Sequence, residues 1–275
     1  LCAGAGLLWV LGAISGFNLI RQLAAVALLA FAVPLLLGPR VAWAVIFPLG
    51  YMVFLVPFGD ELVPALQLIT AKLTIGLVHL TGVKATIDGV FIATPAGLFE
   101  VAEACSGVKF LVAMIAFGVL ACQVCFRSRW RRAGFMLLCL IAPVLANGVR
   151  AWGTIYLAQS VGAEAASGFD HIVYGWFFFA AVIALVIALG WRYFDRPADA
   201  PFVNLDCIDR SLLLKRLAVY GATQARLLVG LALLVAIISG WTAAEARLRA
   251  PLPAQIYLPE VAGWRRIDYK PSTWW

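Results

Sequence analysis

The chain has 275 residues, of which 64% are hydrophobic and only 13% are charged, whereas an average soluble protein has about 25% charged residues. A water-soluble fold could not cover this much apolar surface with polar groups, and a disordered chain would not be this apolar, so both classes are excluded. The formal net charge of +7 is therefore interpreted from the positions of basic loops beside membrane helices, and not as a nucleic-acid-binding surface.

Apolar segments that could each form a membrane helix recur along the chain, since a bilayer span needs about 20 mostly apolar residues. Seven spans are predicted, at residues 1–20, 22–38, 41–58, 105–126, 133–155, 172–194 and 227–246. This pattern predicts an all-α polytopic membrane protein. Because the sequence starts without Met inside an apolar run, we expect residues 1–246 to be an N-terminally truncated membrane domain. Residues 247–275 are expected to be a tail outside the membrane that begins a second domain.

The segment between the third and fourth predicted spans has a different character. Residues 61–80 are mostly apolar but include four charged or strongly polar side chains: Glu61, Gln67, Lys72 and His79. This mixture favours an interfacial or re-entrant helix, with an ordinary span as the alternative. Residues 83–87 and 90–93 then alternate loosely around Asp88-Gly89, a signal for a type I′ turn, so a small hairpin is predicted before the fourth span.

Basic residues mark three of the connections between spans. Loop 127–132 contains four Arg, loop 192–226 contains further Arg and Lys, and the turn at 38–40 contains Arg40. If the spans alternate, these connections lie on one side, which the positive-inside rule assigns to the cytoplasm. Segment 59–104, loop 156–171 and the tail are then expected on the outer side of the membrane.

Three residues that could perform chemistry together lie at the outer ends of predicted helices. Cys105 starts the fourth span, Arg150 is near the end of the fifth, and His171 precedes the sixth. A thiolate is a nucleophile, an imidazole can move protons, and a guanidinium can stabilise an oxyanion. Because alternating spans place all three at one level of the membrane, we predict a Cys–Arg–His site at the outer interface.

Four neighbours of these residues are supporting candidates: Glu103, Lys109, Asn147 and Asp170. Lys109 is one helical turn after Cys105 and adds positive charge, and Glu103 belongs to the same string, residues 103–107. Asn147 is three residues before Arg150, so the two share a helix face, and Asn147 is expected to orient Arg150 or the substrate. Asp170 directly precedes His171 and is a candidate to orient its ring.

Each of these residue types also has an ordinary structural interpretation. A cysteine at a helix start is commonly a packing residue, an interfacial histidine is commonly a hydrogen-bonded anchor, and an arginine near a helix end commonly extends to the headgroups. Cys122 and Cys125 form a CxxC at the end of an apolar helix with no histidine nearby, and we interpret them as packing residues. The chain has two histidines and no HExxH motif, so a metalloprotease site is not predicted. No metal or organic cofactor is implied.

Four strings around these positions resemble the exosortase family, membrane enzymes of the exosortase/archaeosortase group in bacteria, and look closest to the exosortase A type. They are VPFGDELVPALQLITA at 56–71, EVAEACSG at 100–107, ANGVRA at 146–151 and DHIVYGWFFF at 170–179. They occur in the family's order and cover roughly residues 41–195. The tail at 253–275 resembles the start of an exopolysaccharide-associated domain that is sometimes fused behind exosortases, with an ordinary amphipathic tail as the alternative.

The resemblance implies a site and a reaction. In the family, the Cys of the EACSG string, the Arg of the N-x-x-R string and a later His are the proposed catalytic residues, and they correspond here to Cys105, Arg150 and His171. The implied activity is that of a cysteine protease or transpeptidase in the bacterial inner membrane. Its site would face the periplasm, and the family is linked to exopolysaccharide export.

The resemblance also implies partners. The substrates would be exported proteins with a C-terminal signal, composed of a Pro-Glu-Pro motif, a transmembrane helix and a basic tail. The lipid bilayer and an unidentified acceptor nucleophile complete the set, and nucleic acid is not expected to bind.

The alternative function is that of a non-catalytic membrane component or a transporter of a polysaccharide export system. A transporter is expected to have polar or broken-helix features near the middle of the bilayer, and the spans at 105–126, 172–194 and 227–246 have almost none. A non-catalytic component predicts that replacing Cys105 and His171 with alanine leaves function intact.

Overall fold

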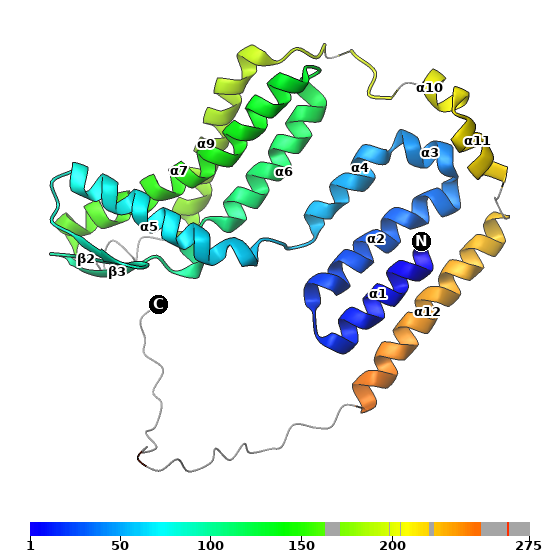
Figure 1. The fold of residues 1–275 in the computed structure, drawn as a ribbon, viewed down its shortest axis with the longest axis horizontal. Helices are drawn as coiled ribbons and strands as arrows, with labels where there is room; N and C mark the ends of the chain where they lie inside the picture. Colours follow the sequence, from blue (N-terminus) through cyan, green and yellow to red (C-terminus); the bar gives the residue numbers. More distant parts are fainter. Residues whose placement is uncertain (163–170, 198, 204, 220–222, 249–262, 264–275) are drawn as a thin grey trace.

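The computed structural model describes residues 1–162, 171–197, 199–203, 205–219, 223–248 and 263. Helices form nearly all of this part, together with one small sheet (Figure 1). Six helical segments in it are long and apolar enough to cross a membrane: Asn18–Leu37, Asp60–Leu80, Glu103–Cys125, Arg129–Val161, Gly175–Tyr193 and Gln224–Ala244. The predicted all-α polytopic membrane fold is confirmed, with boundaries that differ in places. The predicted tail at 247–275 lies, apart from residues 247, 248 and 263, outside the described residues.

Three helices from the two ends of the sequence pack together: α1 (Cys2–Ser15), α2 (Asn18–Leu37) and α12 (Gln224–Leu248) (Figure 1). The span predicted over 1–20 ends earlier than expected, because Gly16 takes a left-handed φ of 77° and stops α1 after 14 residues. α1 and α12 approach closely at Gly6, where an added Cβ would lie 2.7 Å from Cδ1 of Ile238. This contact has no room for a larger residue unless Ile238 moves.

Residues 41–58 do not form the single span predicted for them. The segment is divided into α3 (Pro39–Ala44), α4 (Ile46–Tyr51) and the 3₁₀ turn η1 (Met52–Leu55). Pro48 has no N–H, and a proline ring inside a helix collides with the carbonyl four residues earlier. That carbonyl belongs to Ala44, the last residue of α3, which accounts for the position of the break.

α5 (Val63–Leu80) follows the 3₁₀ turn η2 (Asp60–Leu62) and packs against α7 (Arg129–Val161). It lies across α7 at the end of the helices that carries the sheet (Figure 1). The segment Asp60–Leu80 is also as long and apolar as a span needs to be. The interfacial or re-entrant placement of this helix therefore stays a prediction.

The predicted hairpin is present, but it belongs to a larger antiparallel sheet. The strands are β1 (Thr86–Asp88), β2 (Phe91–Thr94) and β3 (Gly97–Glu100), in the order β1-β2-β3. Asp88 pairs with Phe91, so the turn residues are Gly89 and Val90, one position later than predicted. Gly89 has a φ of 58°, and no described residue other than glycine has a positive φ, which fits a type II′ turn and not the predicted type I′ turn.

One face of the sheet is fixed to the helices by apolar contacts. Ile92 of β2 is fully buried among Ala71 of α5 and Ile155 of α7. Phe99 lies opposite Ile92 on β3 and is half-buried on the same face, whereas Leu98 is 67% exposed. The sheet thus rests on α5 and α7, and the chain runs from β3 directly into the turn that precedes α6.

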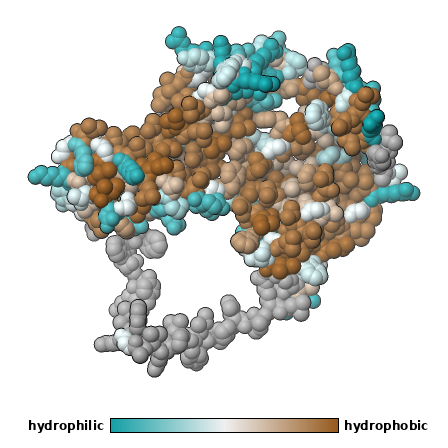
Figure 2. All heavy atoms as spheres, viewed as in Figure 1, coloured by the Kyte–Doolittle hydropathy of each residue, from teal (hydrophilic) through white to brown (hydrophobic). Residues whose placement is uncertain are grey.

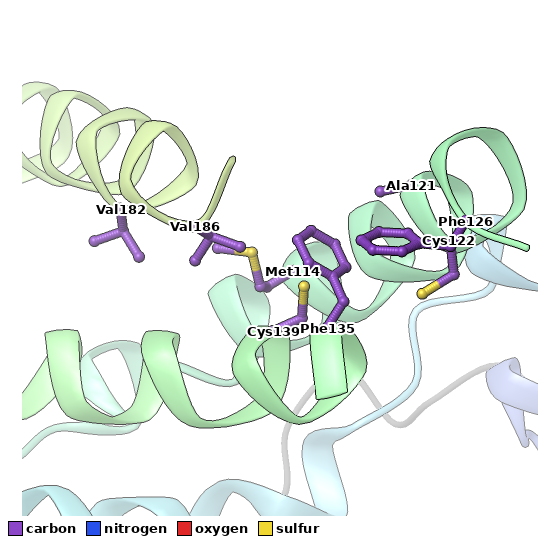
Figure 3. Packing of buried hydrophobic residues seen from close by; sticks show 8 residues of the cluster. All are labelled: Met114, Ala121, Cys122, Phe126, Phe135, Cys139, Val182 and Val186. Atoms are coloured by element: carbon purple, nitrogen blue, oxygen red, sulfur yellow. The ribbon is translucent and has the colours of Figure 1, made fainter. Parts of the chain in front are cut away.

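α6 (Val108–Cys125), α7 and α9 (His171–Gly190) form a helix group with a shared apolar core. Figure 3 shows this core, whose buried members are Met114, Ala121, Cys122, Phe126, Phe135, Cys139, Val182 and Val186. Cys122 and Cys139 therefore lie among apolar side chains, as packing residues do.

The opposite end of this helix group is joined by Asp195, which follows the 3₁₀ turn η4 (Trp191–Tyr193). Its carboxylate accepts the backbone N–H groups of Arg127 at 2.7 Å and Ser128 at 3.2 Å. α10 (Leu205–Arg210) and α11 (Leu212–Val219) follow and contact α3. Figure 2 shows hydrophilic residues gathered over this end of the molecule and mostly hydrophobic residues along the helices, which is the pattern expected of a membrane protein.

Candidate functional site

Cys105 lies in a short turn between β3 and α6. It ends the 3₁₀ turn η3 (Glu103–Cys105), and α6 begins only at Val108, after an N-cap at Gly107 with a left-handed φ of 80°. The sequence predicted that Cys105 would be the first residue of the helix. Instead, the thiol is carried by a tight, half-buried turn just outside the helix, so its position depends on the residues that hold that turn.

Asn147 of α7 is one of these residues. It is 5% exposed, and its Nδ2 donates hydrogen bonds to the carbonyl of Cys105 at 2.8 Å and to Oγ1 of Thr70 at 3.0 Å. A Cβ on Gly107 would lie 2.8 Å from Cγ of Asn147, so the turn and the amide are in direct contact. From the sequence, Asn147 was expected to orient Arg150 or the substrate. In the structure, the hydrogen bonds of Asn147 connect α5, α7 and the Cys105 turn.

Arg150 is one helical turn after Asn147 and only 7% exposed. Its guanidinium carbon lies 5.7 Å from the ring centroid of Phe110, and that ring stacks on Phe179 of α9 with centroids 4.7 Å apart. Arg150 also lines the same cavity as Cys105. A buried guanidinium is favourably placed for an anionic group beside it.

Cys105, Asn147 and Arg150 line one cavity of about 90 Å³. Two threonines, Thr74 of α5 and Thr154 of α7, add hydroxyl groups, and the sheet closes one side; the sheet residues are Ile92, Phe99 and Glu100. The sequence prediction missed Thr70, Thr74 and Thr154. A spacing of four residues could have indicated two of them, because it places Thr74 on the same helix face as Thr70, and Thr154 on the same face as Arg150.

His171 is the first residue of α9, and its side chain lies outside the described part of the chain, as does all of Asp170. The neighbouring turn of α9 is described. An added Cβ on Gly175 would lie 3.7 Å from Nη2 of Arg150, so this helix face is turned toward the guanidinium. Position 171 is four residues earlier, on the same face by helical spacing.

Two supporting candidates are not brought to the cavity. Lys109 and Glu103 are both exposed, and neither lines the cavity around Cys105. The sequence suggested that Lys109 lies one helical turn after Cys105. The left-handed Gly107 interrupts the helical register between these two residues, so they are not related in this way.

Comparison with known proteins identifies one family. The sequence model of the transmembrane exosortases matches residues 1–188, a range that contains every residue of the cavity around Cys105. No curated protein and no solved structure matches the chain.

Proposed function

Because the chain belongs to the exosortase family, we propose that it is a membrane cysteine peptidase or transpeptidase that processes exported proteins bearing a C-terminal, Pro-Glu-Pro-type sorting signal. The observation that carries this proposal is the convergence of Cys105 and Arg150 on one small cavity from different parts of the fold. A nucleophile beside a buried cation, with a histidine position on the facing helix, is suited to acyl transfer.

Cys105 is the proposed nucleophile. Its thiolate attacks the carbonyl carbon of the scissile peptide bond, and a carbon–sulfur bond forms while the carbonyl oxygen becomes an oxyanion. Arg150 lines the same cavity as Cys105 and stabilises first the thiolate and then the oxyanion. Asn147 positions the reacting residue through its hydrogen bond to the carbonyl of Cys105.

His171 is the proposed proton carrier. It accepts the thiol proton and returns a proton to the departing amine when the carbon–nitrogen bond breaks, leaving a thioacyl-enzyme. Water or an acceptor amine then attacks the thioacyl carbon and releases Cys105. Asp170 is proposed to orient the imidazole.

The membrane itself contributes to positioning. A substrate whose signal includes a membrane helix diffuses in the same plane as the enzyme, and its scissile bond lies at a fixed depth. Confinement of this kind removes much of the orientational cost of bringing the bond to Cys105. We place the cavity on the periplasmic side of the bacterial inner membrane and link the activity to exopolysaccharide export.

The decisive experiment follows cleavage of a sorting-signal reporter co-expressed with the protein. Cys105→Ala and Cys105→Ser are expected to reduce processing by at least about 10³-fold, since removing a nucleophile leaves only residual catalysis. Cys125→Ala, at the far end of α6, is the matched control and should process normally. Normal processing by Cys105→Ala would remove the thiol from the mechanism.

Hydroxylamine provides a test of the intermediate. It attacks a thioacyl carbon and is expected to leave a hydroxamate at the new C-terminus of the reporter, detectable by mass spectrometry, with the wild type but not with Cys105→Ala. Cleaved reporter that never carries a hydroxamate would contradict a thioacyl-enzyme.

A further inference from the structure

β3 is the outer strand of the sheet and borders the cavity around Cys105. The sheet order is β1-β2-β3, and no further strand lies beyond β3 in the described part of the chain. Phe99 and Glu100 of β3 line the same cavity as Cys105 and Arg150. Among the described residues, an unpaired strand edge thus ends beside the proposed nucleophile.

The register shows which backbone groups of β3 face outward. Thr94 pairs with Gly97 across a two-residue turn and Ile92 pairs with Phe99, while the N–H of Val101 donates to the carbonyl of Val90 at 2.9 Å. In an antiparallel pair, alternate residues bond to the partner strand. The N–H and C=O groups of Leu98 and Glu100 therefore point away from β2, toward the outer edge.

The size of the cavity restricts what can enter it. About 90 Å³ holds a small side chain or a few waters, whereas a helix is about 10 Å wide. A helix is too wide for this space, so we expect the chain around the scissile bond to be extended. An extended peptide beside an open strand edge gains main-chain hydrogen bonds, which is the common mode of strand addition.

We infer that the outer edge of β3 binds the extended substrate segment next to the scissile bond, as a fourth strand paired with the backbone of Leu98 and Glu100. This inference rests on the proposed function. It also agrees with the proposed signal, because two prolines separated by one residue both turn their missing N–H to the same side of a strand. The glutamate between them then presents its N–H to β3.

The first test removes one outward donor. Glu100→Pro deletes the N–H at the cavity end of β3, and an edge strand tolerates proline where the N–H faces out. Reporter processing is expected to fall roughly fivefold to tenfold, which corresponds to the upper range of the net free energy that one hydrogen bond contributes. Glu100→Gln keeps the N–H and changes only the carboxylate, so it is expected to lose less processing than Glu100→Pro, which separates the backbone from the carboxylate.

Ile87→Pro is the matched control on the opposite edge. Ile87 lies between the paired residues Thr86 and Asp88 of β1, so its N–H also points out of the sheet. It is expected to process at the wild-type rate. The alkylation rate of Cys105 by iodoacetamide reports whether the site itself is intact in each variant.

A second measurement decides the case even if Glu100→Pro disturbs the Cys105 turn. In Cys105→Ala, a benzophenone residue in place of Leu98 is expected to capture the uncut reporter, while the same residue in place of Ile87 should not. Equal capture at both edges, or none at position 98, overturns the inference. If Glu100→Pro is fully active while Cys105→Ala is inactive, only the pairing fails; if Cys105→Ala is active, the proposed function fails.

Discussion

Gly107 fixes the position of Cys105 through both its backbone and its surroundings. Its φ of 80° is left-handed, a conformation that glycine adopts without strain. An added Cβ would be 2.8 Å from Cγ of Asn147, the residue that donates to the carbonyl of Cys105. Both the backbone conformation at position 107 and the contact with Asn147 therefore require a glycine in the turn that carries the thiol.

Gly107→Ala is expected to destabilise the protein and reduce reporter processing. The left-handed backbone costs about 1–2 kcal/mol with a Cβ present, and overpacking against Asn147 adds about 1–3 kcal/mol. Thermal unfolding in detergent measures the stability, and the alkylation rate of Cys105 measures displacement of the thiol.

Gly82→Ala is the matched control for this substitution. Gly82 has a similar φ of 77°, but an added Cβ there meets nothing within 4 Å. Gly82→Ala adds only the cost of a left-handed backbone, so its unfolding temperature should fall less than that of Gly107→Ala. Its reporter processing should stay near the wild-type level. Equal losses in the two variants would mean that the contact with Asn147 has no role.

The sequence was sufficient to propose Cys105 and Arg150, because nucleophilic and charged residues are rare in apolar helices and their types fit one reaction. Asn147 was proposed from its spacing of three residues from Arg150. The sequence could not give their contacts. Lys109 was misplaced because one left-handed glycine breaks the helical register. Thr70 was missed because a threonine inside an apolar helix commonly bonds its own backbone, whereas this one accepts a hydrogen bond from Asn147.

The helix group around the cavity is joined at its other end by the carboxylate of Asp195. The Arg127 N–H that it accepts is the main cause that lowers the pKa of Asp195, with smaller contributions from Ser128 and Arg131. A depressed folded-state pKa means that the ionised carboxylate stabilises the fold above its unfolded pKa of about 3.9. That contribution is lost as the pH falls through the lower, folded value.

Asp195→Asn is therefore expected to lower the unfolding temperature at pH 7. The difference from wild type should be constant above about pH 5 and should shrink as the pH falls through the unfolded pKa of about 3.9 toward the lower, folded pKa. Melting curves in detergent over this pH range measure it.

Asp209→Asn serves as the comparison for the Asp195 substitution. Asp209 pairs with Arg40 at 3.7 Å, and both side chains are largely exposed, so the pair contributes little. This variant should melt like the wild type throughout. If Asp195→Asn lowered the unfolding temperature equally at every pH, the carboxyl group would stabilise the fold through its shape and not through its charge.

Hydropathy predicted the existence of the long helices well and their ends less well. The break after Ala44 depends on Pro48, yet Pro34 and Pro143 lie inside continuous helices, so proline alone does not locate a break. β3 is only four residues long, too short for its alternation to stand out. The pairing of β3 with β2 depends on contacts of the sheet with α5 and α7. Contacts between such distant segments cannot be predicted from a local sequence pattern.

α6 separates two chemically different ends of the molecule. Its 18 residues span about 27 Å, close to the hydrocarbon thickness of a bilayer. Cys105 and the sheet lie at one end, and exposed Arg127, Arg129 and Arg131 lie at the other. The arginine-rich end is expected to face the cytoplasm, because basic loops stay on that side. The cavity is then expected to open toward the periplasm, where the proposed exported substrates are found.

Labelling with a membrane-impermeant maleimide measures this sidedness. In a background with Cys2, Cys105 and Cys125 replaced by alanine, Leu98→Cys on the sheet is expected to react in intact spheroplasts. Cys207, which is exposed on α10, should react only after lysis. A membrane-permeant maleimide should label both positions in either preparation, which controls for local accessibility. Labelling of Cys207 but not of position 98 in intact spheroplasts would reverse the orientation and place the proposed nucleophile on the side that exported substrates have already left.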